Sequence, residues 1–331
     1  MKRERVAVLG FGAWGTAVAA LLAEGGHAVR AWTIEEDVVA GVERERRNSK
    51  YLPHCALPPA LEVTADGARA LQGASVVVWA VPTQHLRAVA RRLRSVFPPG
   101  SLHVSLAKGF EIGTRQRPTA VLIGELALPH CAALLGPSHA EEVASGQPTL
   151  VTACAESSEI ATRVQHLFHG ERLRVYRNDD VIGAECGAAL KNVIAIATGI
   201  ADGLRFGDNT KAALVTRGLG ELGRLGAALG GRQETIFGLT GLGDLITTCF
   251  SRHSRNRRVG EEMARGRALE VVLRDLGQVA EGVETSRVAL ELARDARVAV
   301  PITEQVVAVL FERKTPQAAL EDLMARDPGA E

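Results

Sequence analysis

In the first half of the chain, short apolar runs alternate with segments of helical or charged character. Ser75–Pro82 is almost wholly apolar, as expected of a strand that is covered on both faces. Leu86–Val96 has helical spacing, and Glu35–Lys50 is predicted to be largely a polar helix. The predicted strands are Val6–Leu9, Ala28–Trp32, Ser75–Pro82, Leu102–Lys108, Ala132–Gly136 and Thr149–Ala153, and the last strand is expected to end near Tyr176. This alternation predicts a doubly wound parallel sheet.

Beyond Asp180 the pattern changes, because long Ala- and Leu-rich segments with helical spacing replace the short runs. The predicted helices are Val181–Asp202, Lys211–Leu229, Ser254–Gly266, Thr285–Ala296 and Ile302–Phe311. Strand signals are few in this half. The sequence therefore predicts an α/β domain over residues 1–179 and an all-α domain over residues 180–331.

A glycine motif follows the first predicted strand. Gly10, Gly12 and Gly15 have the spacing G-x-G-x-x-G, and an Ala/Leu-rich helix follows them. In dinucleotide-binding folds these glycines permit a tight turn, a close approach of backbone to pyrophosphate, and close packing of helix on strand. The helix N-terminus then points N–H groups and its positive dipole end at the phosphates. Since Ala28–Trp32 follows at the right distance, the sequence predicts a Rossmann-type dinucleotide site.

The same N-terminal stretch has a second interpretation. Met1–Arg5 is basic, Val6–Ala23 carries no charge, and Ala17-Val18-Ala19 resembles a cleavage site, which together outline a signal peptide or membrane anchor. The strand–turn–helix interpretation is favoured because it explains each glycine. Sequencing the mature N-terminus distinguishes the two.

The end of the second strand bears on the choice of dinucleotide. In such folds an acid near this point binds the ribose 2′-OH, and Glu35 lies close by, after Thr33 and Ile34. No arginine stands at the strand tip, where a 2′-phosphate would favour one. The sequence therefore leans mildly to NAD over NADP. Alternatively, Glu35 only begins a helix, where an acid is favourable in any case.

Composition and charge narrow the class of protein. The 331 residues carry a formal net charge of +1, so no overall field favours nucleic acid or an anionic membrane. The five cysteines include no C-x-x-C pair, which disfavours a zinc site or a disulfide framework and fits a reducing, cytoplasmic compartment. We expect no metal site, no nucleic-acid partner and no membrane span.

Lys191 is the first candidate for chemistry, because it is the only charged residue between Cys186 and Ala201. Desolvation lowers the pKa of a lysine, which suits proton transfer near neutral pH. Alternatively, Lys191 lies on the one solvent-exposed (wet) stripe of a core helix. Asn192 beside it offers a polar group that can orient a substrate.

Two further motifs follow. In TGLGDL, Asp244 comes after glycines that let backbone crowd a ligand, and it can either hold a lysine ammonium or cap a helix. Ser251–Arg258, SRHSRNRR, can be a phosphate clamp, a nucleic-acid patch or a solvated helix start. The low net charge disfavours the nucleic-acid interpretation.

Lys108 and the segment Gly136–Ser138 each follow a predicted strand. Ligands bind at the carboxyl ends of strands in such sheets, so both are candidate binding elements.

Several motifs in this order and spacing resemble those of bacterial NAD(P)-dependent glycerol-3-phosphate dehydrogenases, and the resemblance covers nearly the whole chain. They are GFGAWGTA (10–17), YLP (51–53), AKGFE (107–111), GPSHAEEV (136–143), KNVIAI (191–196), GLGDL (241–245), SRNRR (254–258), EG (281–282) and PITE (301–304). The resemblance implies reversible NAD(P)H-dependent reduction of dihydroxyacetone phosphate to sn-glycerol 3-phosphate. It further implies supply of glycerophospholipid synthesis in the cytoplasm and leaves a homodimer open.

The resemblance also implies roles for individual residues. Lys191 would donate and accept the proton, assisted by Lys108 and Asp244, and Arg255 with Asn256 would hold the phosphate. The implied substrate contacts are Lys108, Gly136, Ser138, Lys191, Asn192, Asp244, Thr248, Ser254, Arg255 and Asn256. The implied cofactor contacts are Gly10, Gly12, Ala13, Trp14, Gly15, Ile34, Tyr51, Lys108, Ala140, Arg255, Val279 and Glu281.

Two positions depart from the family pattern. Ala13 stands where the family often has serine, and Thr33-Ile34 stands where it often has Arg or His, which puts the usual NADP preference in doubt. The competing hypotheses are a 3-hydroxyacid dehydrogenase or ketopantoate-type reductase, and a dinucleotide-binding sensor without catalysis. The SRNRR motif favours a phosphate over a carboxylate substrate, and a sensor would have no need of both Lys108 and Lys191.

Overall fold

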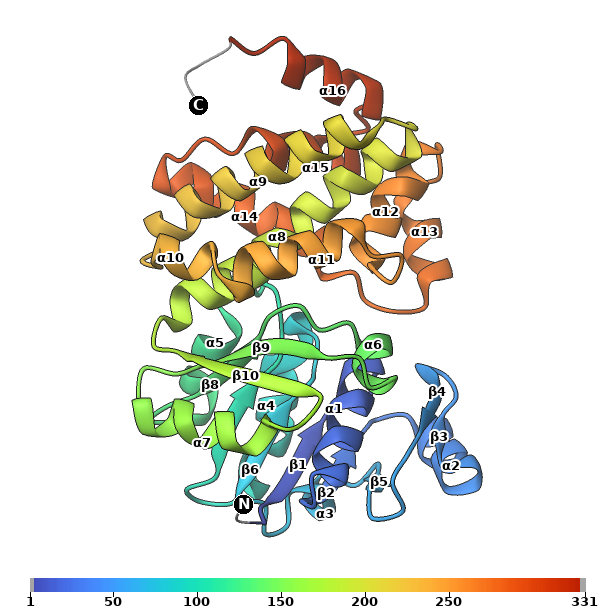
Figure 1. Cartoon of the computed structure of the whole chain (residues 1–331), viewed down its shortest axis with the longest axis vertical. Coiled ribbons are helices and arrows are strands. Elements are labelled where there is room, and N and C mark those ends of the chain that lie inside the picture. The colour runs from blue at the N-terminus through green and yellow to red at the C-terminus, as the bar shows by residue number, and fades with distance from the viewer. Residues whose placement is uncertain (1–2, 328–331) are drawn as a thin grey trace. The chain divides into compact units, whose positions relative to one another are not determined.

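The computed structural model describes residues 3–327 (Figure 1). The described chain forms two compact units. Unit 1 contains the residues up to Lys108 together with Gln116–Val181, and unit 2 contains Gly109–Arg115 and the chain from Ile182 onward. Each unit has a hydrophobic core of its own, so each is described separately.

Unit 1 is built on an eight-stranded sheet with the order β10-β9-β8-β7-β6-β1-β2-β5. The strands are β1 (Arg5–Leu9), β2 (Ala28–Trp32), β5 (Glu62–Thr64), β6 (Val76–Trp79), β7 (Leu102–Ser105), β8 (Ala132–Leu135), β9 (Thr149–Cys154) and β10 (Leu173–Asn178). The predicted parallel sheet is confirmed from β5 to β8. It is wrong at one pairing, because β9 runs antiparallel to β8, with β10 parallel to β9.

Alternate side chains of the strands face two different helical layers. Val6 and Val8 of β1 lie in one core with helices α1 (Ala13–Glu24), α6 (Ala140–Ala144) and α7 (Ser158–Phe168). Ala7 and Leu9 lie in the other with α3 (Gly67–Leu71), α4 (Leu86–Leu93) and α5 (Pro118–Leu126). Because successive strand residues point to opposite faces, a fully apolar strand is the expected solution. Short 3₁₀ turns, Thr83–His85 and Arg94–Val96, flank α4.

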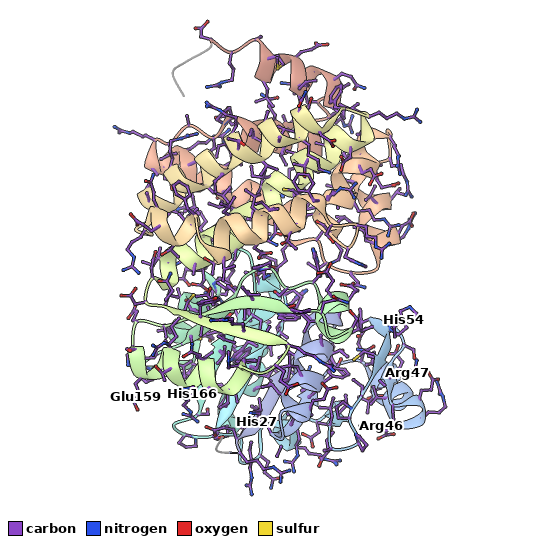
Figure 2. All side chains as sticks on the ribbon, in the orientation of Figure 1. His27, Arg46, Arg47, His54, Glu159 and His166 are labelled. Carbon is purple, nitrogen blue, oxygen red and sulfur yellow. The ribbon has the colours of Figure 1, made fainter. Side chains whose placement is uncertain are left out.

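A small hairpin follows the second strand and differs from the prediction. The polar helix expected over Glu35–Lys50 is shorter, because α2 (Glu36–Glu45) ends at Arg46, whose φ of 51° is left-handed. The chain then forms the antiparallel hairpin of β3 (Arg47–Asn48) and β4 (Leu52–Ala56). Lys50 therefore lies in a hairpin turn rather than on a helix. In Figure 2 the side chains of Arg46, Arg47 and His54 gather around this hairpin.

Unit 2 is helical, as predicted. Its helices are α8 (Val181–Gly203), α9 (Asp208–Ala228), α10 (Gln233–Ile236), a π-helical turn (Leu239–Gly243), α11 (Asp244–Phe250), α12 (Arg255–Ala264), α13 (Leu269–Leu276), α14 (Glu281–Ala296), α15 (Pro301–Phe311) and α16 (Pro316–Met324). Among the described residues, α8 is the one helix long and apolar enough to cross a membrane, and 94% of its apolar stretch is buried. Such burial is that of a core helix around which the others pack.

The segment Gly109–Arg115 belongs to unit 2 although it lies in the N-terminal half of the sequence. Phe110 is 1% exposed and lies in the core of unit 2. Arg115 forms an ion pair with Asp295 of α14. The unit thus draws part of its core from a loop that interrupts the sheet unit.

A buried carboxylate joins α9 to the start of α15. Glu221 is 2% exposed and accepts hydrogen bonds from the backbone N–H of Ile302 at 2.5 Å and of Thr303 at 3.1 Å. The Thr303 hydroxyl donates a third bond at 2.9 Å. These bonds satisfy N–H groups that the first helical turn cannot pair by itself. Burial raises the pKa of the Glu221 carboxyl to about 7, although the three hydrogen bonds oppose the shift.

We expect Glu221→Gln to flatten the pH dependence of stability. Between pH 4.5, the ordinary pKa, and about pH 7, the folded state holds a proton that the unfolded state has released. The stabilisation is full at low pH and is lost as pH rises through this window, by up to about 3 kcal/mol. Urea unfolding followed by circular dichroism measures the difference between wild type and variant.

The control is Glu291→Gln, which removes an exposed carboxylate from α14. It is expected to leave the pH profile of the wild type in place. The prediction is contradicted if the difference in free energy of unfolding between wild type and Glu221→Gln stays constant from pH 4.5 to pH 7.

Candidate active site

The glycine loop of unit 1 has the geometry that its sequence predicts. Gly10 has a φ of +93°, and a Cβ there would lie 2.6 Å from the carbonyl oxygen of Ala80. A Cβ on Gly15 would lie 2.0 Å from the carbonyl oxygen of Gly10, so α1 can pack on β1 only through a glycine. A Cβ on Gly12 would meet nothing within 4 Å. The first and third glycines are thus required by the protein, and the second leaves open space beside the backbone.

The residues that follow this loop fit a dinucleotide. Helix α1 begins at Ala13 directly after Gly12, so its first N–H groups point toward the space beside the loop. The indole N–H of Trp14 is buried and has no hydrogen-bond partner among residues 3–327. A buried donor of this kind is rare in folded proteins and marks a place for a polar ligand atom.

One buried side chain that the sequence analysis did not single out fixes this loop. Asn48 of β3 is 1% exposed and donates to the carbonyl oxygen of Phe11 at 2.7 Å and to the Thr16 hydroxyl at 2.8 Å. Its own oxygen accepts the backbone N–H of Tyr51 at 3.2 Å. The hairpin is therefore tied to the glycine loop by one amide. A polar residue in a polar segment gives no sequence signal for such a role.

Beyond the tip of β2, Ile34 is 66% exposed, and the carboxylate of Glu35 has partners. The Lys50 ammonium lies 2.5 Å from it, and the Tyr51 hydroxyl donates to it at 3.0 Å. Glu35 precedes α2 without capping it by a side-chain bond. Glu35 is thus the N-cap residue of α2, but its side chain faces the hairpin turn and makes no capping hydrogen bond.

At the carboxyl ends of β7 and β8, unit 1 brings three predicted site residues together. The Lys108 ammonium donates to the carbonyl oxygen of Gly136 at 2.8 Å and to the Ser138 hydroxyl at 3.2 Å. Gly136 has a φ of +136°, a conformation that favours glycine. Ala140, a predicted cofactor contact, is buried at the start of α6. Lys108 is thereby held on an edge of the sheet where α/β folds bind ligands.

In unit 2, Lys191 lies in a buried polar cluster. It is 5% exposed, and its ammonium donates to Asp244 at 2.9 Å and to the Thr248 hydroxyl at 2.5 Å. Thr248 in turn donates to the backbone carbonyl oxygen of Asp244 at 2.6 Å. The wet-stripe alternative for Lys191 is therefore wrong. The helix-cap alternative for Asp244 is also wrong, because Gly243 is the N-cap residue of α11.

Two glycines bring this cluster together. A Cβ on Gly187 of α8 would lie 2.9 Å from the Cα of Gly241 in the π-helical turn. Since the backbones touch here, Lys191, one turn further along α8, reaches Asp244 just after the π turn. π-Helical turns are rare and occur frequently at functional sites.

A second chain of amides lies beside the lysine. The Asn256 amide donates to the side-chain oxygen of Asn192 at 2.8 Å, and its own oxygen accepts the backbone N–H of Gly282 at 2.9 Å. A Cβ on Gly282 would lie 2.7 Å from the carbonyl oxygen of Asn192. Helices α8, α12 and the first turn of α14 are thus joined through Asn256, which is 8% exposed.

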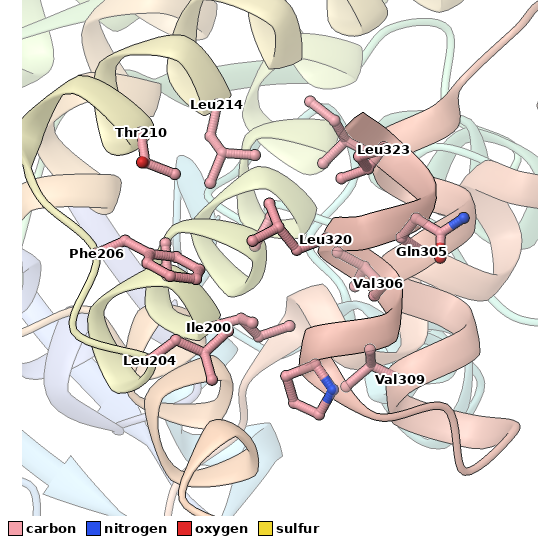
Figure 3. Close-up of a pocket in the computed structure, with 15 residues that line it drawn as sticks. Ile200, Leu204, Phe206, Thr210, Leu214, Gln305, Val306, Val309, Leu320 and Leu323 are labelled. Carbon is pink, nitrogen blue, oxygen red and sulfur yellow. The ribbon is translucent and has the colours of Figure 1, made fainter. Parts of the chain in front are cut away.

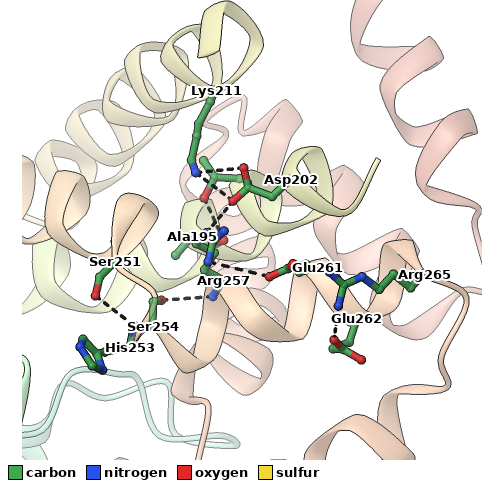
Figure 4. Close-up of polar contacts among 11 residues, drawn as sticks. Ala195, Asp202, Lys211, Ser251, His253, Ser254, Arg257, Glu261, Glu262 and Arg265 are labelled. Atoms are coloured by element: carbon green, nitrogen blue, oxygen red, sulfur yellow. Dashed lines mark hydrogen bonds and ion pairs between the residues drawn. The ribbon is translucent and has the colours of Figure 1, made fainter. Parts of the chain in front are cut away.

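The start of α12 presents the basic motif. Ser254 is buried and caps the helix by accepting the backbone N–H of Arg257 at 3.2 Å, and Arg255 is exposed with a bond to Gln278 at 3.3 Å. Arg257 instead pairs with Asp202, as Figure 4 shows. Asp202 also receives the Lys211 ammonium at 2.8 Å. Arg257 therefore fixes the helix, whereas Arg255 and Arg258 are exposed.

The two remaining predicted cofactor contacts lie near the start of α14. Val279 is 44% exposed and Glu281 begins the helix. Thus the structure groups Lys191, Asn192, Asp244, Thr248 and Asn256 in unit 2, and Lys108, Gly136 and Ser138 in unit 1.

A separate apolar pocket in unit 2 encloses about 420 Å³ of space, part of it open to solvent. Leu204, Phe206, Leu214, Val306 and Leu320 contribute to its wall (Figure 3). Thr210 and Gln305 supply its few polar atoms, and no titratable side chain lines it. The pocket therefore offers no group for catalysis.

Family comparisons decide the identity of this arrangement. Residues 5–161 match the sequence model of the NAD-dependent glycerol-3-phosphate dehydrogenase N-terminus, and residues 180–321 match that of its C-terminus. The chain belongs to the NAD-dependent glycerol-3-phosphate dehydrogenase family. The predicted resemblance and the predicted Rossmann-type and helical fold are thereby confirmed.

Individual relatives agree over their full length. The glycerol-3-phosphate dehydrogenase (NAD(P)+) of Chlorobium luteolum is 47% identical, over 98% of this chain and 99% of that protein. The corresponding protein of Geobacillus kaustophilus is also 47% identical, over 98% and 95%. The crystal structure of glycerol-3-phosphate dehydrogenase from Coxiella burnetii has a TM-score of 0.94 at 38% identity, over 98% and 99%.

A ketopantoate reductase from Ralstonia eutropha has a TM-score of 0.60 at 16% identity, over 96% of this chain and 99% of that one. A likeness at this level shows a shared fold alone. The family match therefore favours the dehydrogenase over the reductase that the sequence left open.

We expect Gly199→Ala to destabilise unit 2 because α12 lies directly against α8 at this position. The new Cβ would lie 1.8 Å from the carbonyl oxygen of Arg257, so backbone must move. Such overpacking lowers the free energy of unfolding by about 1–3 kcal/mol. Urea unfolding measures the loss.

The matched control is Gly220→Ala on α9, where the new Cβ would meet only the flexible end of Arg224, at 3.2 Å. This variant is expected to equal or exceed the wild type in stability, since alanine is the better helix former. Equal stabilities of the two variants contradict the prediction.

Proposed function

We propose that this chain catalyses the reversible, NAD(P)H-dependent reduction of dihydroxyacetone phosphate to sn-glycerol 3-phosphate. The observation that carries the proposal is the buried cluster of Lys191, Asp244 and Thr248 in a member of this family. A buried ammonium that is already oriented by two partners can act on a reacting oxygen without reorganisation.

The nicotinamide, when bound, supplies a hydride to the central carbonyl carbon. Negative charge then develops on the carbonyl oxygen, and Lys191 donates a proton to it as general acid. In the reverse direction the same amine accepts the alcohol proton. Asp244 holds the ammonium in position, and Thr248 fixes its direction by a second hydrogen bond. Asn192 provides an amide that can orient the substrate hydroxyls.

Lys108 adds a second positive charge near the substrate in this proposal. Its ammonium donates to the backbone carbonyl oxygen of Gly136 and to the Ser138 hydroxyl, which hold it at the carboxyl ends of β7 and β8. A cation of this kind lowers the energy of the developing oxyanion. Gly136 and Ser138 then present backbone and hydroxyl groups to the same ligand.

The start of α12 would hold the substrate phosphate. Arg255 is exposed, and its guanidinium fork matches phosphate oxygens. The first turn of α12 adds N–H groups and its positive dipole end. Asn256 uses one amide hydrogen on Asn192 and keeps the other for the ligand. Binding energy from the phosphate then orients the carbonyl for reduction.

We place the reaction in the cytoplasm, where it would supply the backbone of glycerophospholipids. The five cysteines are thiols in the structure, with no disulfide among them, as a reducing compartment favours. A homodimer is the assembly to test, by light scattering. A non-catalytic sensor is disfavoured by the buried lysine cluster, since binding alone does not need it.

We expect Lys191→Met to lower kcat for dihydroxyacetone phosphate by about 10²–10⁴-fold, the range typical of a lost general acid. The Kd for NADH is measured by fluorescence without ketone. It is expected to stay within about threefold of the wild-type value, which corresponds to less than about 1 kcal/mol. Absorbance at 340 nm measures turnover.

Lys211→Met provides the matched control. Lys211 is another lysine of unit 2 that is 9% exposed and paired with an aspartate. Lys191→Met removes the cation that pairs with the buried Asp244, whereas in Lys211→Met Asp202 keeps its ion pair with Arg257, so the first variant is expected to lose more stability. Only Lys191→Met should lose most of its turnover, and a similar kcat in both folded variants refutes the role of Lys191.

We expect Arg255→Ala to raise KM for dihydroxyacetone phosphate by about 10–100-fold, because a charged hydrogen bond is worth about 1.5–3 kcal/mol. The neighbouring exposed arginine, Arg258, serves as control through Arg258→Ala. Steady-state kinetics at fixed NADH separate KM from kcat. An unchanged KM in Arg255→Ala removes the phosphate clamp from the proposal.

A further inference from the structure

A lysine stands beside the tip of β2, where the sequence showed no cation. The chain from Thr33 to Glu35 leads out of β2, and the backbone N–H of Glu35 donates to the Thr33 hydroxyl at 3.2 Å. The Lys50 ammonium lies 2.5 Å from the Glu35 carboxylate and 3.4 Å from that of Asp37. The cation reaches this point from the turn between β3 and β4.

The position of this turn is fixed relative to the glycine loop. Asn48 donates to Phe11 in the loop and to Thr16 of α1, and it accepts the backbone N–H of Tyr51. Lys50 is therefore flanked by two residues that one buried amide holds against the dinucleotide site. The backbone of Lys50 is therefore held in place, while its flexible side chain lets the ammonium move.

In dinucleotide folds the adenosine ribose lies beyond the tip of the second strand. An acid there accepts the 2′-OH of NAD, whereas a cation there accommodates the 2′-phosphate of NADP. Here an acid and a cation stand together and are paired with each other. The cation can bind a 2′-phosphate only if it leaves the acid, whereas the acid can accept a 2′-OH while the pair stays intact.

We infer that Glu35 and Lys50 form an exchangeable pair that admits both dinucleotides, with Lys50 binding the 2′-phosphate of NADPH and Glu35 the 2′-OH of NADH. This inference rests on the dinucleotide site proposed at the glycine loop. With NADPH, the ammonium leaves Glu35 for the phosphate. With NADH, Lys50 remains on Glu35 and Asp37, and a second lone pair of Glu35 accepts the ribose hydroxyl.

The exchange is energetically easy because the pair is exposed. The Lys50 side chain is 45% exposed and that of Glu35 28%. Ion pairs in such surroundings contribute little to stability, so breaking one demands little. A phosphate with more negative charge than a carboxylate competes well for the ammonium. The Tyr51 hydroxyl stays behind as a donor to Glu35.

The charge of Lys50 is secure over the working pH range. The hydrogen bond to Glu35 holds the pKa of the Lys50 ammonium above its usual range. Arg47 on the same hairpin carries a further positive charge (Figure 2). The missing cation of the strand tip is thus replaced from the neighbouring hairpin.

The test uses the full-length protein and measures Kd for NADPH and NADH by nicotinamide fluorescence, without ketone. Lys50→Met is expected to raise Kd for NADPH by about 10–100-fold, the value of one charge-assisted hydrogen bond. Kd for NADH is expected to change by less than about threefold. The salt dependence of NADPH binding should weaken in the same variant.

Glu35→Gln tests the other half of the pair. It removes the charge that holds Lys50, so NADPH is expected to bind more tightly and NADH more weakly than in the wild type. Arg44→Met is the matched control, because it removes an exposed cation of α2 that pairs with neighbouring Glu45. It should leave the ratio of the two Kd values unchanged.

Equal changes of both Kd values in Lys50→Met, or none, overturn the inference while leaving the dinucleotide site intact. Failure of the wild type to bind either dinucleotide overturns the inference together with the proposed function. A selective loss of NADPH binding, with NADH binding retained, supports it.

Discussion

The ion pair of Lys191 and Asp244 is the constraint on which the helical unit depends. Both side chains are nearly inaccessible, at 6% and 3% exposed, and removing one partner from such a pair leaves a buried charge that costs about 3–5 kcal/mol. Gly187 lets the backbone of α8 lie against Gly241 in the π-helical turn, which brings the two side chains within reach of each other. In the proposed reaction this pair holds an ammonium in position for a proton transfer.

Much of the fold was predictable where the signal is local. The apolar strand Arg5–Leu9, the glycine spacing after it and the helix Ala13–Glu24 follow from rules that act within a few residues. The lysine in an apolar helix was visible because it breaks a pattern. Its partner was less certain, since a single aspartate in a glycine-rich turn fits a helix cap equally well.

Other features could not be predicted because they depend on residues that meet only in three dimensions. The reversed direction of β9 follows from how the chain returns to the sheet, and strand sequences carry no mark of their direction. Asn48 and Lys50 lie in a polar segment, where a buried anchor and a proposed cofactor contact look like ordinary surface residues. The strand tip alone indicated NAD, because the lysine that we propose for the 2′-phosphate comes from a hairpin turn in a segment that was predicted to be helix.

The path of the chain limits how this enzyme can be taken apart. It leaves the sheet unit after Lys108, returns at Gln116 and leaves again after Val181. A fragment that starts at the second crossing would lack Phe110 from its core and the Arg115 partner of Asp295. A gene fragment that encodes only the chain from Ile182 onward would therefore give a helical unit with a cavity where Phe110 packs. Because unit 2 takes Gly109–Arg115 from the N-terminal half of the sequence, a single cut of the chain does not yield two complete domains.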